Sequence, residues 1–417
     1  MGESMRNFWK WSLLVFLAAR SSDVVQSVIG LWLVPKYVPA ADVGAILPMT
    51  QTAIMLSLPL TVLMVPVSRW LTIYTVRGEH GKVKSLLRVA LYGSLVAALM
   101  MSDLAGLFLP GLFRVARVSE RGFSVVLLFA GALSAVAPVF DSALQGLRRF
   151  GTVVLAGFVA APLRLLVTLA LMPFRVFTGY MLGISVASLS QIAISWCGVR
   201  RDLSGAFPAQ PFWRDDGRAM LRYVAPIALM ALVWNSLGAL QAMLIRTNLP
   251  DVENAAYFII TRFGDIGGWV GLSIGFVAFP TAACSQTKGE DALPVLVKSL
   301  LVTVLVGGGV AFAYLFLARP LMMSVECWRN YAGYASYVPL WTIRSALGAA
   351  IGVFFACEKA MGNFRFLLYF IPWAMVESAV LFFLPTLLWV IAWLVASEVV
   401  QMAMILGMIV RRRKLSR

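Results

Sequence analysis

Four arginines fall inside long apolar runs, where a charged side chain is costly and therefore needs a partner or a function. Arg20 precedes Asp23 by three residues, and Arg262 precedes Asp265 by the same spacing. Residues three apart share one face of a helix, so each arginine is expected beside its acid. A guanidinium group can bind phosphate or diphosphate through two parallel hydrogen bonds and stays charged at physiological pH. The pattern indicates either internal ion pairs or a hydrated cavity that presents arginine to an anionic substrate.

Polar residues gather near these pairs in the first, second and seventh apolar runs. Gln26 follows the first pair by one turn, and Gln51 and Asn235 lie in the other two runs. Such side chains are expected to face a cavity or another helix, because lipid offers them no hydrogen bonds. The candidate substrate-binding residues are therefore Arg20, Asp23, Gln26, Gln51, Arg164, Asn235, Arg262, Asp265 and Arg344.

Two features near these candidates have open interpretations. Gly267, Gly268, Gly271 and Gly275 lie close together in the eighth run. They would allow either close helix packing or the bending that a moving helix needs. Glu377 and Glu398 would either bind a proton or sodium ion, or make hydrogen bonds inside the bundle.

Catalysis by the chain's own side chains is not expected. His80 is the single histidine and lies in a hydrophilic loop, and the four cysteines form no CxxC pair. These residues predict no metal site, no cofactor and no nucleophile with a histidine base. The longest hydrophilic stretch, residues 199–218, is too short to bury a core of its own. The protein is therefore not expected to be an enzyme.

The elements that would position these side chains are transmembrane helices. Of the 417 residues, 60% are hydrophobic and 13% are charged, and the mean hydropathy is +0.85. The apolar runs are too long for barrel strands, which have about 9–11 residues. Pro385 divides the last two runs. Twelve helices are expected, at about 11–34, 44–73, 85–109, 122–144, 152–173, 177–197, 219–243, 254–281, 294–317, 333–357, 365–384 and 386–410.

The charge distribution predicts the orientation in the membrane. The chain holds 35 Lys and Arg against 19 Asp and Glu. Most basic residues outside the spans fall in the loops on the side of the two termini, which predicts that both termini are cytoplasmic. The excess of positive charge is then explained by topology, and no nucleic-acid partner is needed to account for it.

Internal repetition predicts two lobes. The segment Val83–Leu87 recurs as Val297–Leu301, and two prolines recur in the same order at about half the chain length. An offset of six spans gives two parallel six-helix lobes. The expected organisation is an N-terminal lobe at 1–198, a cytoplasmic linker at 199–218 and a C-terminal lobe at 219–417.

The chain resembles the multidrug/oligosaccharidyl-lipid/polysaccharide exporter (MOP) superfamily, and in particular its bacterial polysaccharide-unit (Wzx-like) flippases. The resemblance rests on the two six-helix halves, on residues 143–150, and on residues 255–262 leading to 279–282. It implies an all-α membrane protein with a fold like that of the multidrug and toxin extrusion (MATE) transporters, alternating access between lobes and a cationic central cavity.

The resemblance also implies a function. We expect an inner-membrane flippase for a polyprenyl-diphosphate-linked glycan, with Arg20 and Arg262 on the diphosphate and Asp23 and Asp265 holding or releasing them. A polysaccharide polymerase and a chain-length regulator are the expected protein partners. A peptidoglycan-precursor (lipid II) flippase, which typically has two further helices, and a MATE-type cation-coupled drug antiporter remain alternatives, as does an enzyme acting on the same lipid carriers.

Overall fold

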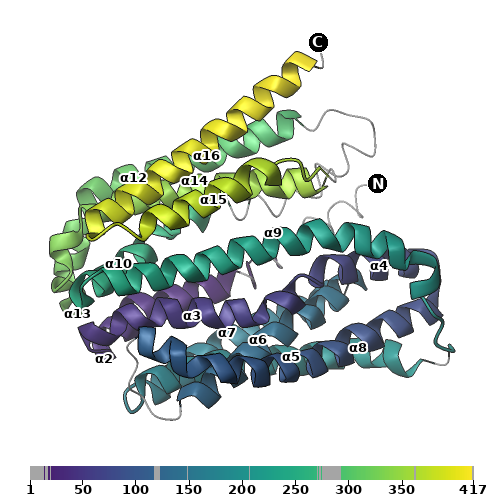
Figure 1. The fold of residues 1–417 in the computed structure, drawn as a ribbon. Helices are drawn as coiled ribbons and strands as arrows, with labels where there is room; N and C mark the ends of the chain where they lie inside the picture. Colours follow the sequence, from purple (N-terminus) through teal and green to yellow (C-terminus); the bar gives the residue numbers. More distant parts are fainter. Residues whose placement is uncertain are drawn as a thin grey trace. The chain divides into compact units, whose positions relative to one another are not determined.

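A computed structural model describes the chain as a set of long helices (Figure 1). Within the described residues there is no β-strand. The described residues are Leu14, Leu17, Ala18, 20–116, 123–147, 149–205, 207–269, Gly271, Ile274, 293–360 and 363–415.

The first half of the chain begins with helical residues 20–28, which continue into a π-helix, η1 (Ile29–Leu33), and a short helix, α2 (Val34–Tyr37). The helices that follow are α3 (Ala40–Thr61), α4 (Met64–Val76), α5 (His80–Ala116), α6 (Phe123–Gly146), α7 (Phe150–Leu171) and α8 (Val176–Ser204).

The second half has a similar order of elements. Its helices are α9 (Trp213–Asn248), α10 (Asp251–Gly264), α12 (Leu293–Ser324), α13 (Glu326–Arg329), the 3-10 helix η2 (Ala332–Tyr334), α14 (Tyr337–Ala360), α15 (Leu367–Leu381) and α16 (Leu387–Leu415). The break between α15 and α16 falls at Pro385, as expected, because proline cannot continue a helix.

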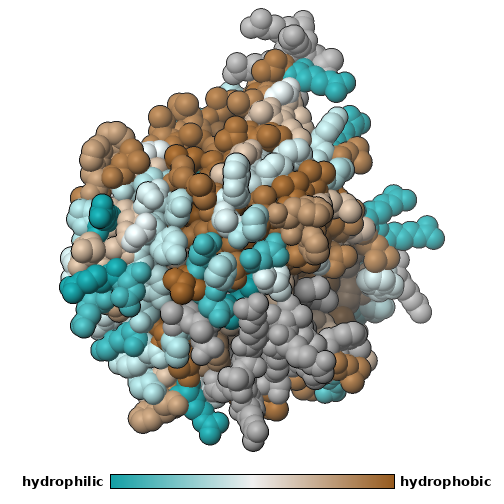
Figure 2. Space-filling model, turned by 60° about the vertical axis from the view of Figure 1, so that its left-hand side comes forward, coloured by the Kyte–Doolittle hydropathy of each residue, from teal (hydrophilic) through white to brown (hydrophobic). Residues whose placement is uncertain are grey.

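Eight helices of the described part of the chain are long and apolar enough to cross a membrane. They lie within α5, α6, α7, α8, α9, α12, α14 and α16, and α15 is a shorter apolar helix. Large apolar side chains remain exposed along them, such as Leu99, Phe312 and Trp389. Figure 2 shows that such hydrophobic residues cover much of the visible face. The chain is a multi-pass membrane protein.

Each of the twelve expected spans contains helical residues, so the expected fold class is confirmed. The second span differs from the expectation of one continuous helix at 44–73. It consists of α3 and α4, separated by a turn at Val62 and Leu63. Pro66 is the third residue of α4. Its ring would clash with the carbonyl of Val62 in a continuous helix, which explains the break.

The eighth span also differs from the expected 254–281. Helix α10 ends at Gly264, Asp265 forms a turn, and residues 266–269 are helical again. The remainder of this span, apart from Gly271 and Ile274, lies outside the described residues, as does Gly275.

The chain divides into two compact units. The N-terminal unit comprises Met1–Ile29 and Ala45–Ala239, and the C-terminal unit comprises Gly30–Gly44 and Leu240–Arg417. Helix α6 contacts α4, α5, α7 and α8 in the first unit, whereas α14 contacts α10, α12 and α16 in the second. These two helices are the fourth span of each half, so each unit is built around the same position of the repeat.

The connection between α8 and α9 is tied to the start of α5 in the N-terminal unit. Lys84 Nζ donates hydrogen bonds to the carbonyls of Gly205 at 2.5 Å and Phe207 at 3.2 Å. The Gln210 amide donates to the carbonyl of Gly81 at 3.2 Å, and the ring of His80 stacks on that of Phe207 at 4.9 Å between centroids. Residues 207–212, here named the linker strap, are thereby bound to the N-terminal unit.

Replacing Gly81 with valine is expected to detach the linker strap. A Cβ atom at this position would lie 2.7 Å from both Gln210 Cγ and the carbonyl oxygen of Pro208, and the latter is backbone that cannot rotate away. Hydrogen–deuterium exchange of the Gln210 amide should accelerate at least tenfold, because its hydrogen bond to Gly81 is lost. Arg88→Gln, exposed on the same helix, is the control. An unchanged exchange rate of the Gln210 amide in Gly81→Val would contradict the attachment of the linker strap to α5.

Candidate functional site

A polar cluster in the N-terminal unit joins the first helix to α7 and α8. The guanidinium of Arg164, on α7, donates a hydrogen bond to Gln26 Oε1. Gln26 Nε2 donates to the hydroxyl oxygen of Tyr180, on α8, at 2.7 Å. Arg164 also lies 5.8 Å from the centroid of the Tyr180 ring, within the range of a cation–π interaction. Gln26 therefore connects two helices that are far from it in the sequence.

Close packing of α7 and α8 places Tyr180 in this cluster. A Cβ atom on Gly179 would lie 2.6 Å from the backbone nitrogen of Met172, where α7 ends. Only glycine permits that approach without displacing backbone. The next residue, Tyr180, is then held 2% exposed with its hydroxyl against Gln26.

The Arg20–Asp23 pair forms as the spacing predicts. Arg20 Nη1 lies 2.5 Å from Asp23 Oδ2, and the two side chains are 23% and 42% exposed. Positions 20, 23 and 26 follow one stripe of the helix, since each is one turn after the last. The pair thus precedes the Gln26–Arg164 contact along the same side of the first helix.

Gln51 and Asn235 do not join this cluster through any contact among the described residues. Gln51 is half-buried on α3. Asn235 Nδ2 donates to the carbonyl of Ala231 at 2.8 Å, within its own helix α9. Their expected role in substrate binding stays a prediction.

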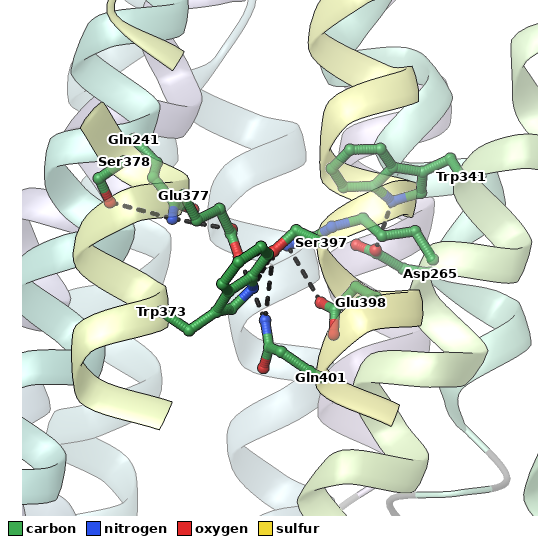
Figure 3. Close-up of polar contacts among 10 residues, drawn as sticks. Gln241, Asp265, Trp341, Trp373, Glu377, Ser378, Ser397, Glu398 and Gln401 are labelled. Atoms are coloured by element: carbon green, nitrogen blue, oxygen red, sulfur yellow. Dashed lines mark hydrogen bonds and ion pairs between the residues drawn. The ribbon is translucent and has the colours of Figure 1, made fainter. Parts of the chain in front are cut away.

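A second polar cluster lies in the C-terminal unit, where α10, α14 and α16 pack together (Figure 3). Arg262 Nη1 lies 3.7 Å from Asp265 Oδ2, and Asp265 Oδ1 accepts a hydrogen bond from the Trp341 indole at 3.1 Å. Arg344 Nη2 lies 3.7 Å from Glu398 Oε1. The Arg344 guanidinium is also stacked 4.5 Å from the Trp341 ring centroid. Trp341 therefore connects the two ion pairs.

Small residues allow these helices to come close. A Cβ atom on Gly264 would lie 2.5 Å from Trp341 Cδ1, and Cβ atoms on Gly267 and Gly268 would lie 2.5 Å from side-chain atoms of Thr342 and Ser345. These three glycines are thus explained by close packing on α14. The same packing brings Asp265 to Trp341.

A third acid organises α9, α15 and α16 within the C-terminal unit. Glu377 Oε1 accepts a hydrogen bond from Gln241 at 2.9 Å. Its Oε2 accepts from Gln401 at 3.2 Å and from the Ser397 hydroxyl. Figure 3 shows these side chains pointing toward one another between α15 and α16. Glu377 thus accepts hydrogen bonds from three side chains and connects the three helices.

Sequence analysis did not place Glu377, Glu398, Ser397 or Gln401 among the candidate site residues. The sequence feature that could have identified these residues is a group of polar side chains inside an otherwise apolar helix, namely Ser397, Glu398 and Gln401. Its spacing places 397 and 401 one turn apart. Which acid pairs with arginine and which with amides depends on the packing of α14 against α16.

Some atoms of the C-terminal cluster keep hydrogen-bonding capacity. Within the described residues, Nε of Arg262, Nε of Arg344, Oε2 of Glu398 and Oε1 of Gln401 are buried without a hydrogen-bond partner. Both arginine–acid distances of 3.7 Å exceed the 2.7–3.2 Å range of a hydrogen bond. Each guanidinium group therefore has an acid beside it but retains a hydrogen-bond donor without an acceptor among the described residues.

Comparison with known structures identifies the fold. No protein-family model matches this sequence, and no curated protein matches it. Among solved structures, the chain is similar to an inward-facing MATE family multidrug resistance transporter of the MOP superfamily. The TM-score is 0.73 at 12% identity, over 97% of this chain and 96% of the other. The chain has the MATE fold.

Two further structures support this. A Vibrio cholerae MATE transporter gives a TM-score of 0.70 at 12% identity, covering 99% of this chain and 97% of its own. An outward-facing multidrug resistance MATE transporter gives 0.67 at 15% identity, covering 97% and 94%. The MATE fold therefore extends over the whole chain, and the two polar clusters lie one in each unit of it.

Proposed function

We propose that the chain is a transporter of the MOP superfamily that moves a lipid-linked oligosaccharide across the bacterial inner membrane by alternating access. The carrier would be a polyprenyl diphosphate, and both termini would be cytoplasmic. The MATE fold supports a transporter, since solved structures of this fold include transporters in inward- and outward-facing conformations. The chain would supply binding and movement, without covalent chemistry. A polysaccharide polymerase and a chain-length regulator would act with it.

The main support for an anionic substrate is the incomplete hydrogen bonding of Arg262 and Arg344. Both lie in membrane-embedded helices with one acid each at 3.7 Å. Their Nε–H groups have no acceptor among the described residues. A diphosphate offers several charged oxygens and would satisfy these donors better than the long ion pairs do. A cationic substrate would instead meet two positive charges here.

The drug antiporter remains the second candidate, and a specific observation favours it. Glu377, Glu398 and Asp265 form an acidic group in the C-terminal unit, which would suit a cation. Two of the solved structures named above are also multidrug resistance transporters. In that case neutralising an acid should matter more than neutralising an arginine.

Transport by Arg262→Gln and Asp265→Asn variants separates the two candidates. The full chain would be reconstituted in vesicles, with a fluorescent polyprenyl-diphosphate oligosaccharide or a cationic dye as probe. Loss of one charged hydrogen-bond group costs about 1.5–3 kcal/mol, so Arg262→Gln should reduce glycan movement by roughly 10- to 100-fold. Arg69→Gln is the control, because Arg69 is exposed and stacks 4.4 Å from the Tyr223 ring centroid. Intact glycan movement in Arg262→Gln, with dye efflux lost in Asp265→Asn, would favour the antiporter.

A further inference from the structure

The contact between Arg344 and Glu398 has features of an exchangeable pair. The carboxylate oxygen and the guanidinium nitrogen are 3.7 Å apart, and the Glu398 side chain is 8% exposed against 24% for Arg344. The arginine is thus the more accessible partner. A ligand can reach it while the glutamate stays buried.

The packing of α14 against α16 determines where the Glu398 carboxylate lies. Gly348 lies one turn after Arg344 on α14, and a Cβ atom there would come 3.2 Å from Glu398 Oε1. Absence of a side chain at 348 gives the carboxylate room beside the guanidinium. The other oxygen of Glu398, Oε2, has no hydrogen-bond partner among the described residues.

The charges around Glu398 come from three other helices. Arg344 faces it from α14, Glu377 lies on α15, and Tyr257, Arg262 and Asp265 lie at the α10 side of the cluster. Arg262 is paired with Asp265, and Glu377 accepts hydrogen bonds from Gln241, Ser397 and Gln401. Arg344 is therefore the main positive neighbour of Glu398.

We propose that Glu398 takes up a proton when an anionic phosphate group binds Arg344, so that ligand and proton bind together. This inference rests on the proposed function and concerns the same site. In the empty state the glutamate carboxylate neutralises the arginine. When the phosphate replaces it, one proton passes from a buffer acid in the solvent to the Glu398 carboxylate. The buffer acid becomes its conjugate base, an O–H bond forms on Glu398, and no other bond changes.

The physical reason is the cost of a buried charge without its partner. Once phosphate neutralises Arg344, a charged Glu398 would lie in the bundle beside Glu377 with no positive group of its own. A buried acid in that state binds a proton instead of remaining charged. The new hydroxyl needs an acceptor. Gln401 supplies one, because its Oε1 is buried without a partner among the described residues and Gln401 lies one turn further along α16.

The sign of the coupling follows from this exchange. In a cation site, the ligand and the proton compete for the same acid, so protons weaken ligand binding. In the site proposed here, the charged Glu398 and the anionic ligand compete for Arg344, and protonation of Glu398 removes that competition. Protons therefore favour ligand binding. The affinity for a diphosphate should fall as the pH rises through the range in which Glu398 of the ligand-bound state loses its proton.

Calorimetry of the full chain in lipid nanodiscs tests the proposal with farnesyl diphosphate as the probe. Titrations at about pH 8, above the last phosphate ionisation near 6, in two buffers of different ionisation enthalpy give the protons taken up per ligand. The wild type should take up close to one. Glu398→Gln should take up none and bind equally well or better. Glu358→Gln, which removes another buried acid from α14, should retain the uptake.

Each result decides a different question. No binding of the probe by the wild type would overturn the proposed function and this inference together. Binding without proton uptake, or uptake that persists in Glu398→Gln, would overturn the inference alone. Should Glu398→Gln not fold, infrared difference spectra of the wild type provide the second measurement. The ligand must then produce a protonated carboxyl band, and its absence would contradict the proposal.

Discussion

Replacing Arg344 with glutamine is expected to abolish glycan transport and to lower the stability of the protein. The substitution removes the donors offered to the diphosphate and leaves Glu398, 8% exposed, without its positive partner. Removing one member of a fully buried pair costs about 3–5 kcal/mol. The cost here is smaller, because Arg344 is 24% exposed and the unpaired acid can bind a proton. The thermal unfolding midpoint of the purified protein should fall by several degrees, and transport in reconstituted vesicles should fall by at least 100-fold.

The double variant Arg344→Gln with Glu398→Gln separates stability from transport. It removes both charges, so most of the lost stability should return, while transport should remain absent because the arginine is still missing. Arg344→Lys should retain the charge and part of the transport, since an ammonium lacks the planar fork that binds phosphate. Arg319→Gln, exposed on α12, is the matched control. Wild-type transport by Arg344→Gln would exclude this residue from the site.

Replacing Gly179 with valine is expected to have the largest effect on folding. Its Cβ atom would lie 2.6 Å from the nitrogen and 2.9 Å from the Cα of Met172, and both atoms are backbone. The start of α8 would have to separate from the end of α7, at a cost of about 3 kcal/mol or more. Tyr180, the adjacent residue, would then lose its hydrogen bond with Gln26. We expect a strongly reduced yield of folded protein by size-exclusion chromatography.

A matched glycine supplies the control for this prediction. Gly93 lies on α5, and a Cβ atom there meets nothing within 4 Å. Gly93→Val should therefore leave the yield and the thermal unfolding midpoint close to those of the wild type. Equal yields from the Gly179 and Gly93 variants would contradict the close approach of α7 and α8.

Local sequence predicted the all-helical fold class and the first contacts inside the helices. Twelve spans are expected from the length of the apolar runs, because a helix in lipid must satisfy its own backbone over about 20 residues, and each expected span contains helical residues. The pairs Arg20–Asp23 and Arg262–Asp265 follow from helical periodicity, and both occur. The division of the second span was not expected, since the effect of Pro66 on the preceding turn depends on where the helix starts.

Longer contacts were decided only by the tertiary structure. Arg164 meets Gln26 across 138 positions of the sequence, and Arg344 meets Glu398 because α14 packs on α16. A polar side chain in an apolar helix indicates that a partner is needed. The sequence does not indicate which helix supplies that partner. The choice depends on where glycines leave room, as Gly179 does for the backbone of Met172 and Gly348 does for the Glu398 carboxylate. That is a property of two helix surfaces together.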